Sequence, residues 1–152
     1  MNIWLQWFAL GLLVPIVWYC AYVDIRTHKI PNNVTYPALI FFGGFQFLLQ
    51  SDKTSMLIGL AVGFLFFFLP ALFLGSNAIG VGDAKLGALM GVVLGWPGIL
   101  LALIISQVSA LLFVAPMLLT RRMTLKSKLP LGPFLALGYT VTLVWALFLA
   151  RY

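Results

Sequence analysis

The chain has 152 residues, of which 63% are hydrophobic and only 8% are charged. This balance excludes a soluble domain of ordinary composition and predicts that lipid is the main solvent of the protein. The net charge of +6 could indicate a nucleic-acid-binding protein. The basic residues, however, lie between apolar runs and not along one polar face, so we interpret them as a signal of membrane topology and expect no nucleic acid partner.

Apolar runs follow one another along the whole chain, separated by charged residues, proline or glycine. They predict an all-α, polytopic membrane protein with about six transmembrane helices, since a helix needs roughly 20 apolar residues to cross a bilayer. The first run is long enough to span and lacks a basic start, so we interpret it as a mature helix and not as a secretory signal. The predicted helices cover residues 3–23, 34–50, 55–75, 84–95, 98–119 and 131–150.

Small residues and turn residues add detail to this pattern. The segment 84–95 is too short to cross alone at about 1.5 Å per residue, and Gly95-Trp96-Pro97-Gly98 predicts a tight turn after it. Glycines allow membrane helices to approach closely, and we expect this of Gly43, Gly44, Gly59 and Gly63. No long repeat or low-complexity tract is present, so the sequence predicts a single membrane-embedded domain over residues 1–152.

The positions of the basic residues predict the orientation of the helices. By the positive-inside rule, the side with most Lys and Arg faces the cytoplasm. Six crossings then place both chain termini on the opposite, non-cytoplasmic side. The connections on the cytoplasmic side carry Arg26, Lys29, Lys85, Arg121, Arg122, Lys126 and Lys128, and only Lys53 and Arg151 lie opposite.

The chain has only three acidic residues. Asp52 lies in a short polar loop on the outward side, where exposure to solvent explains it. Asp24 and Asp83 both lie at the cytoplasmic edge of apolar runs, where ionised side chains are costly and often mark a functional site. Each also has a structural interpretation: Asp83 could cap the helix that follows it, and Asp24 could end the first helix by pairing with Arg26 or Lys29.

The residue types around the second acid favour a functional interpretation. In Gly80-Val81-Gly82-Asp83, two glycines allow backbone conformations closed to other residues and the close approach of a substrate strand. Peptide hydrolysis by an aspartic dyad needs one carboxylate that takes a proton from water and a protonated partner that polarises the scissile carbonyl. Asp24 and Asp83 are the candidates for this pair.

A single cysteine, Cys20, excludes an intrachain disulfide and a CxxC zinc site, and we expect no metal or cofactor.

Three blocks of sequence resemble the type IV prepilin peptidases, which are membrane aspartic proteases of the GxGD class. The resemblance covers most of the chain and preserves the order of the blocks. The first block is Asp24 with Ile30-Pro31-Asn32-Asn33-Val34-Thr35. The second is Gly80-Val81-Gly82-Asp83-Ala84-Lys85-Leu86, followed by Gly91 and Gly95-Trp96. The third is Leu129-Pro130-Leu131-Gly132-Pro133-Phe134-Leu135-Ala136.

The resemblance implies cleavage of the short basic leader of type IV prepilins or pseudopilins at the cytoplasmic face of a bacterial inner (plasma) membrane. The implied partners are the prepilin substrate helix and the lipid bilayer. Asp24 and Asp83 carry over as the catalytic pair, Gly80 and Gly82 as the motif that shapes the site, and Lys85 as a motif position without an assigned role. Larger members have an extra N-terminal cytoplasmic domain linked to methylation. We expect a compact, peptidase-only form, because the first predicted helix begins almost at the start of the sequence.

Two other classes of protein remain as alternatives. A small proton- or cation-coupled transporter would use intramembrane acids, but such acids are expected near the bilayer midplane and in related halves of the chain. A non-catalytic pilin-assembly membrane protein would not need both acids. His28 lies beside Asp24, and we expect an interfacial or substrate-facing side chain there and not a catalytic base.

Overall fold

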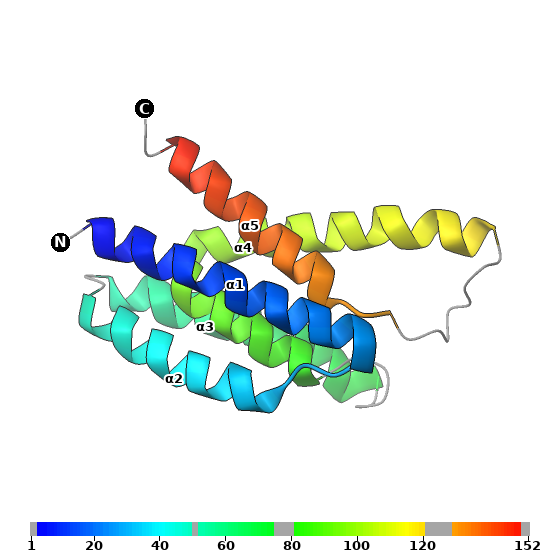
Figure 1. Cartoon of the computed structure of the whole chain (residues 1–152), viewed down its shortest axis with the longest axis horizontal. Helices are drawn as coiled ribbons and strands as arrows, with labels where there is room; N and C mark the ends of the chain where they lie inside the picture. The colour runs from blue at the N-terminus through cyan, green and yellow to red at the C-terminus, as the bar shows by residue number, and fades with distance from the viewer. Residues whose placement is uncertain (1–2, 50–51, 75–80, 121–128, 150–152) are drawn as a thin grey trace.

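The computed structural model describes residues 3–49, 52–74, 81–120 and 129–149. Within these ranges the chain is helical and contains no strand, which confirms the all-α prediction. Figure 1 shows the arrangement of the helices, which are α1 (Ile3–Thr27), α2 (Asn32–Leu49), α3 (Lys53–Leu74), α4 (Val81–Leu119) and α5 (Gly132–Leu149).

The long helix α4 consists of two segments joined at a break. Gly95 has φ 63° and ψ −173°, and Trp96 has φ −92° and ψ 135°, so neither residue is helical. The chain turns back on itself at this point, and the second segment runs against the direction of the first (Figure 1). The predicted turn at residues 95–98 is therefore confirmed, and all six predicted helical segments are present within five helices.

Four helices are long and apolar enough to cross a membrane, namely Trp7–Thr27, Lys53–Phe73, Val81–Leu119 and Gly132–Leu149. The prediction of six spans is thus confirmed only in part, since α2 is not among the four. Large apolar side chains cover much of the surface, with Phe73 81% and Leu48 84% exposed. Apolar surface of this extent is unusual for a soluble monomer and is typical of contact with lipid.

The tightest helix contact joins α3 to the first segment of α4. A Cβ atom at Gly59 would lie 2.3 Å from the carbonyl oxygen of Gly91, and one at Gly63 would lie 2.1 Å from that of Gly87. The two glycine pairs therefore pack backbone against backbone, as small residues permit in membrane helices. The expectation of close packing is confirmed for Gly59 and Gly63.

The contact between α2 and α4 includes a buried amide and no close approach of glycine. A Cβ atom at Gly43 or Gly44 would meet nothing within 4 Å, so the expectation of close packing is wrong for these two residues. Gln46, only 2% exposed, donates a hydrogen bond from Nε2 to the carbonyl oxygen of Val93 at 3.1 Å. Val93 lies four residues before Pro97, which has no N–H to offer, so Gln46 supplies a hydrogen bond that the helix itself cannot make.

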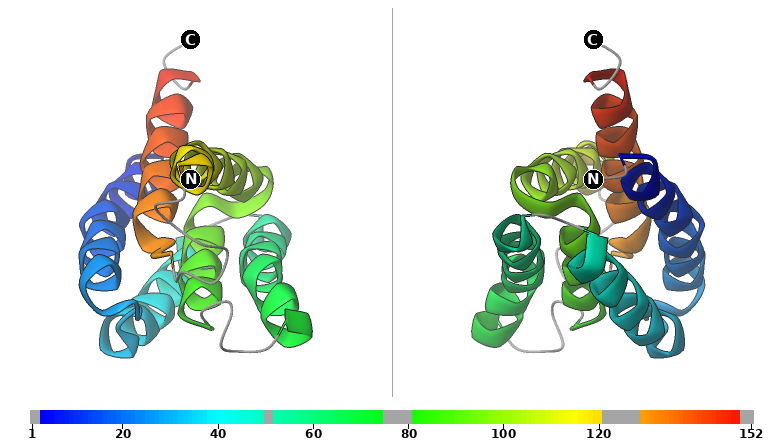
Figure 2. Two further views of the ribbon diagram at one scale, coloured as in Figure 1. Left: turned by 90° about the vertical axis from the view of Figure 1, so that its right-hand side faces the viewer. Right: turned by 90° about the vertical axis from the view of Figure 1, so that its left-hand side faces the viewer.

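The break in α4 is also held from α3. The hydroxyl of Ser55 donates to the carbonyl oxygen of Trp96 at 2.8 Å and accepts from the Trp96 backbone N–H at 3.0 Å. Ser55 thus satisfies both backbone polar groups of a residue that has left the helical conformation. Figure 2 shows the first segment of α4 between α3 on one side and α1 with α2 on the other.

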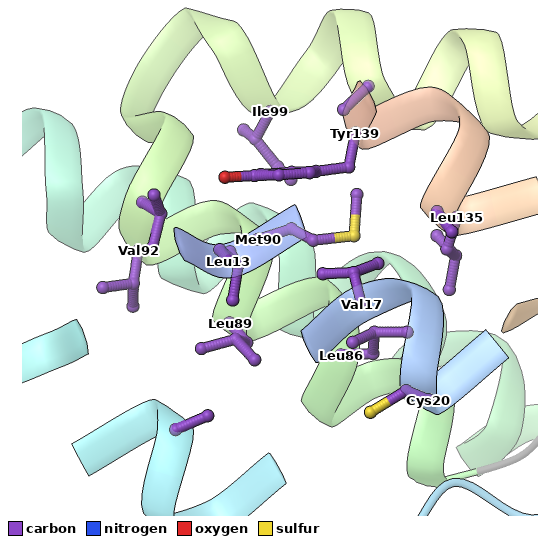
Figure 3. Close-up of a cluster of buried hydrophobic side chains, with 14 of the residues drawn as sticks. Leu13, Val17, Cys20, Leu86, Leu89, Met90, Val92, Ile99, Leu135 and Tyr139 are labelled. Carbon is purple, nitrogen blue, oxygen red and sulfur yellow. The ribbon is translucent and has the colours of Figure 1, made fainter. Parts of the chain in front are cut away.

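The hydrophobic core lies where α1 and α5 meet the first segment of α4. Tyr139 of α5 is fully buried, and its hydroxyl donates to the carbonyl oxygen of Leu10 in α1 at 2.7 Å. A Cβ atom at Gly138 would lie 2.3 Å from the carbonyl oxygen of Ala102, so α5 also packs closely on the second segment of α4. Figure 3 shows the core side chains, which include Leu13, Val17, Cys20, Leu86, Leu89, Met90, Leu135 and Tyr139.

Candidate active site

Two buried acids lie at the same end of the helix bundle. Asp24, 5% exposed, belongs to the last turns of α1, and Asp83, 7% exposed, belongs to the first turn of α4. Helix α1 ends and helices α2, α4 and α5 begin at this end of the molecule (Figure 1). We refer to it below as the acidic end.

The third acid is far from this pair. Asp52 is exposed before the first residue of α3, which runs antiparallel to the first segment of α4. Ser55, three residues after Asp52, forms hydrogen bonds with Trp96. Trp96 lies about 20 Å along α4 from Asp83, at 1.5 Å per residue. Hydrogen bonds from Thr54 and Ser55 hold the pKa of the Asp52 carboxyl below its ordinary value. Asp52 is thus a solvent-exposed cap of α3, in agreement with its structural interpretation.

The carboxyl group of Asp24 contacts α5. Oδ2 accepts a hydrogen bond from the backbone N–H of Gly132 at 2.8 Å. The helix continues beyond Asp24 to Thr27 and ends at His28, which has φ 50° and donates its backbone N–H to the Asp24 carbonyl at 2.8 Å. The prediction that Asp24 could end α1 is therefore wrong, because His28 in the left-handed region does so. The Arg26 guanidinium lies 5.0 Å from the centroid of the Tyr22 ring.

Asp83 lies inside a helix that begins earlier than its sequence predicts. Helix α4 starts at Val81 and not at residue 84, so Asp83 is not the residue that precedes the helix. A carboxylate in a first turn still interacts favourably with the positive end of the helix dipole. The next residue, Ala84, and Leu86 are both fully buried, which places Asp83 directly beside the core.

Gly82 allows the connection between α1 and α2 to approach α4. A Cβ atom at this position would lie 2.9 Å from Cβ of Ile30, which is itself buried. Among the glycines that the structure describes, only Gly95 has a positive φ. The predicted unusual backbone is therefore absent at Gly82, and the close approach that this glycine permits is made by the protein's own Ile30. Gly80 lies outside the described residues.

This contact links the surroundings of the two acids. Ile30 follows Asp24 by six residues, and Gly82 directly precedes Asp83. The segment after the first acid thus packs against the residue before the second acid. Sequence reasoning did not identify Ile30 or Gly132 as site residues, although both belong to the motif blocks. Their contacts depend on how separate helices cross, and the sequence alone gives no signal of that crossing.

Lys85 connects the second acidic segment to α2. Its ammonium group donates a hydrogen bond to Oδ1 of Asn32 at 2.9 Å and lies 4.4 Å from the centroid of the Tyr36 ring. The first contact is a charge-assisted hydrogen bond and the second a cation–π interaction. Both residues belong to the start of α2, so Lys85 holds α2 and α4 together next to Asp83.

The two carboxyl groups of the site suit acid–base chemistry. The described residues contain no group of three or more His, Cys, Asp or Glu side chains that could hold a metal ion. Two carboxyl groups at one end of a membrane bundle can exchange protons with water or with a substrate. Buried acids in this setting are costly and therefore point to function.

The fold and the site together define an all-helical, multi-pass membrane protein with two buried carboxyl groups at one end. Residues 11–115 match the type IV leader peptidase family, and this range includes both acids. The chain belongs to that family.

Curated relatives cover nearly all of the chain and share the name prepilin leader peptidase/N-methyltransferase. The protein from Aeromonas salmonicida (strain A449) is 28% identical over 141 residues, which make up 88% of this chain and 48% of that protein. The proteins from Burkholderia pseudomallei (strain 1026b) and Bacillus subtilis (strain 168) are 32% and 31% identical, over 89% and 90% of this chain and 45% and 55% of their own lengths. The chain spans about half the length of these relatives. No solved structure matches it.

Proposed function

We propose that the protein is a membrane-embedded aspartic endopeptidase that cleaves the short basic leader of type IV prepilins or pseudopilins. The observation that carries this proposal is the burial of Asp24 and Asp83 at one end of the bundle. They are the only buried acids among the described residues. Family membership and the names of the relatives support the reaction and the substrate class.

In the proposed mechanism, Asp24 and Asp83 share one proton across a bound water molecule. The proposed reaction needs one carboxyl group as a base and the other as an acid, which a single shared proton provides. One carboxylate takes a proton from the water, whose oxygen then bonds to the scissile carbonyl carbon. The protonated partner donates a hydrogen bond to the carbonyl oxygen. As the C–N bond breaks, the leaving amine takes up the proton that the base removed from water, which returns the pair to its singly protonated state.

The proposed orientation places the acidic end at the cytoplasmic face of a bacterial inner (plasma) membrane. Arg26, Lys29 and Lys85 lie at the acidic end, whereas Lys53 begins α3 at the opposite end. The positive-inside rule then favours a cytoplasmic acidic end. Four further predicted inside residues, Arg121, Arg122, Lys126 and Lys128, and the outside residue Arg151 lie outside the described residues.

Six crossings remain our proposal for the topology. As one unbroken, straight helix, the 39 residues of α4 would measure about 60 Å. This length is twice the thickness of a hydrocarbon core of roughly 30 Å. The break at Gly95 and Trp96 lets the two segments run in opposite directions, and we propose that each crosses once. The first segment, residues 81–94, is only about 21 Å long, so in this proposal it crosses against its neighbouring helices. Together with α1, α2, α3 and α5, both termini then lie on the non-cytoplasmic side.

Substitution of the two acids tests the proposed reaction. The purified protein in liposomes is incubated with a prepilin, and the processed product is measured by mass. We expect Asp24→Asn and Asp83→Asn each to reduce the rate at least about a hundredfold, as loss of an acid–base group does. Their thermal unfolding should remain close to that of the wild type.

Asp52→Asn is the matched control and should cleave at the wild-type rate, because Asp52 only caps α3 at the far end. Full activity in either Asp24→Asn or Asp83→Asn would refute the dyad. Ion movement across the liposomes without any cleavage would instead support the transporter alternative.

A further inference from the structure

We propose that the backbone N–H of Gly132 positions the Asp24 carboxyl group for the reaction, so that the start of α5 is the third structural element of the active site. This inference rests on the proposed function. Gly132 is buried and is the first residue of α5. It lies 108 residues from Asp24 and donates to Asp24 Oδ2 at 2.8 Å.

The donor is free for this contact because of its place in the helix. The first N–H groups of an α-helix have no partner within the helix and need an acceptor elsewhere. Oδ2 of Asp24 provides that acceptor for Gly132. With Oδ2 fixed, the plane of the carboxyl group is fixed too, and so is the direction in which Oδ1 faces its surroundings.

The contact is possible only because residue 132 has no side chain. A Cβ atom there would lie 2.9 Å from Oδ2 of Asp24, 3.0 Å from Cβ of Asp24 and 3.1 Å from Cα of Ala21. Two of these three atoms belong to the acid itself, and the third belongs to the backbone of α1. Any larger residue would therefore displace either the carboxyl group or the helix that carries it.

Two further contacts hold α5 against its neighbours near this donor. The Tyr139 hydroxyl joins α5 to the Leu10 carbonyl of α1, and the Phe134 ring lies 5.6 Å from that of Phe113 in α4. A rigid donor matters because displacement of a reacting group by about 1 Å can cost a hundredfold in rate. The amide of Gly132 therefore acts as a positioning group and does not itself touch the substrate.

Two changes at residue 132 separate positioning from folding. Gly132→Ala keeps the N–H but adds a methyl group against Asp24. Glycolic acid at position 132, introduced by translation with a hydroxy acid, turns the amide into an ester and removes the N–H without adding an atom. For both variants we expect kcat to fall about ten- to a hundredfold with KM unchanged within about twofold.

The same two changes at Gly138 provide the matched control on the same helix. A Cβ atom at Gly138 would lie 2.0 Å from Oγ of Ser106, so Gly138→Ala disturbs packing at least as severely, but away from Asp24. We expect the position-138 variants to lower the unfolding temperature and to keep the wild-type kcat well below that temperature.

The outcomes distinguish the inference from the proposed function. Wild-type kcat in the ester variant at position 132, with the wild-type protein active, would overturn the inference and leave the proposed function intact. An equal loss of kcat at positions 132 and 138 would also overturn it, because the effect would then be one of packing. A wild-type protein that cleaves no prepilin would overturn the proposed function itself.

Discussion

Lys85 makes both of its described contacts with the first turn and a half of α2, two residues after one of the acids. Its ammonium group is 2.9 Å from Oδ1 of Asn32 and 4.4 Å from the Tyr36 ring centroid. A cation in this position joins two helices, because both contacts connect α4 to the start of α2. The sequence identified Lys85 as a motif position, and the contacts give it a structural task.

Removal of the Lys85 charge should therefore reduce activity. We expect Lys85→Met to lower kcat/KM about tenfold, because α2 and the start of α4 lose a charge-assisted hydrogen bond worth about 1.5–3 kcal/mol. Lys85→Arg should recover part of the activity, since arginine also stacks on aromatic rings. Cleavage of a prepilin in liposomes provides the measurement.

Lys53 offers a matched control for this experiment. Its ammonium group lies 4.3 Å from the centroid of the Phe47 ring, which is a similar cation–π contact at the opposite end of the molecule. Lys53→Met should leave kcat/KM unchanged. Equal effects of the two methionine variants would mean that Lys85 has no special connection to the site.

Among the helices, the pair α3 and α4 depends most on the absence of side chains. A Cβ atom at Gly63 would lie 2.1 Å from the Gly87 carbonyl oxygen, which is a backbone atom that cannot rotate away. We expect Gly63→Ala to destabilise the protein by about 1–3 kcal/mol, as overpacking of a tight contact does. Thermal unfolding in detergent measures the effect. Gly44→Ala, where a Cβ atom would meet nothing within 4 Å, should have no destabilising effect.

A second prediction about contacts between helices concerns Gln46, which joins α2 to α4. Gln46→Leu leaves the Val93 carbonyl without the hydrogen bond that Pro97 cannot provide, and we expect a loss of about 1 kcal/mol in unfolding free energy. Thr142→Val is the control, because the buried Thr142 hydroxyl has no hydrogen-bond partner among the described residues. If both variants were equally stable, the Gln46 contact would be irrelevant to the break.

The helices were predicted from the sequence more accurately than the contacts between them. Apolar runs and turn residues are local properties, so they indicated the six helical segments and the break at Gly95. Helix α4 begins three residues earlier than predicted, because Gly82 adopts the helical conformation and not the unusual backbone that its sequence context predicts. The face that a glycine presents depends on how helices cross, which explains why the same expectation was right for Gly63 and wrong for Gly43.

The candidate site was predictable to a similar extent. Scarcity of acids in an apolar chain singled out Asp24 and Asp83, and the structure buries both at one end. The contacts of Ile30 with Gly82 and of Gly132 with Asp24 join residues distant in sequence. Such contacts follow from the three-dimensional packing of α1, α4 and α5, and a single sequence holds no record of that packing.

At the scale of the whole molecule, the two ends of the helix bundle differ in the charged residues that they carry. The acidic end has both buried acids together with Arg26, Lys29 and Lys85, and the opposite end has the break in α4 held by Ser55. Helix α1 ends and helices α2, α4 and α5 begin at the acidic end (Figure 1), so four helices have an end near the proposed site. A reaction at a membrane surface is consistent with this arrangement, since a substrate helix in the bilayer can present its polar end there.

The central claim is that Asp24 and Asp83 share one site, and crosslinking tests this claim independently of activity. In a Cys20→Ala background, the pair Asp24→Cys and Asp83→Cys is treated in native membranes with a short bifunctional thiol reagent. The pair Asp52→Cys and Asp83→Cys is the control, because about 20 Å of α4 separates its two positions. We expect an intramolecular crosslink between positions 24 and 83, detected by mass spectrometry of the digested protein, and none between positions 52 and 83. Failure of positions 24 and 83 to crosslink, while each cysteine reacts with a monofunctional reagent, would contradict a shared site.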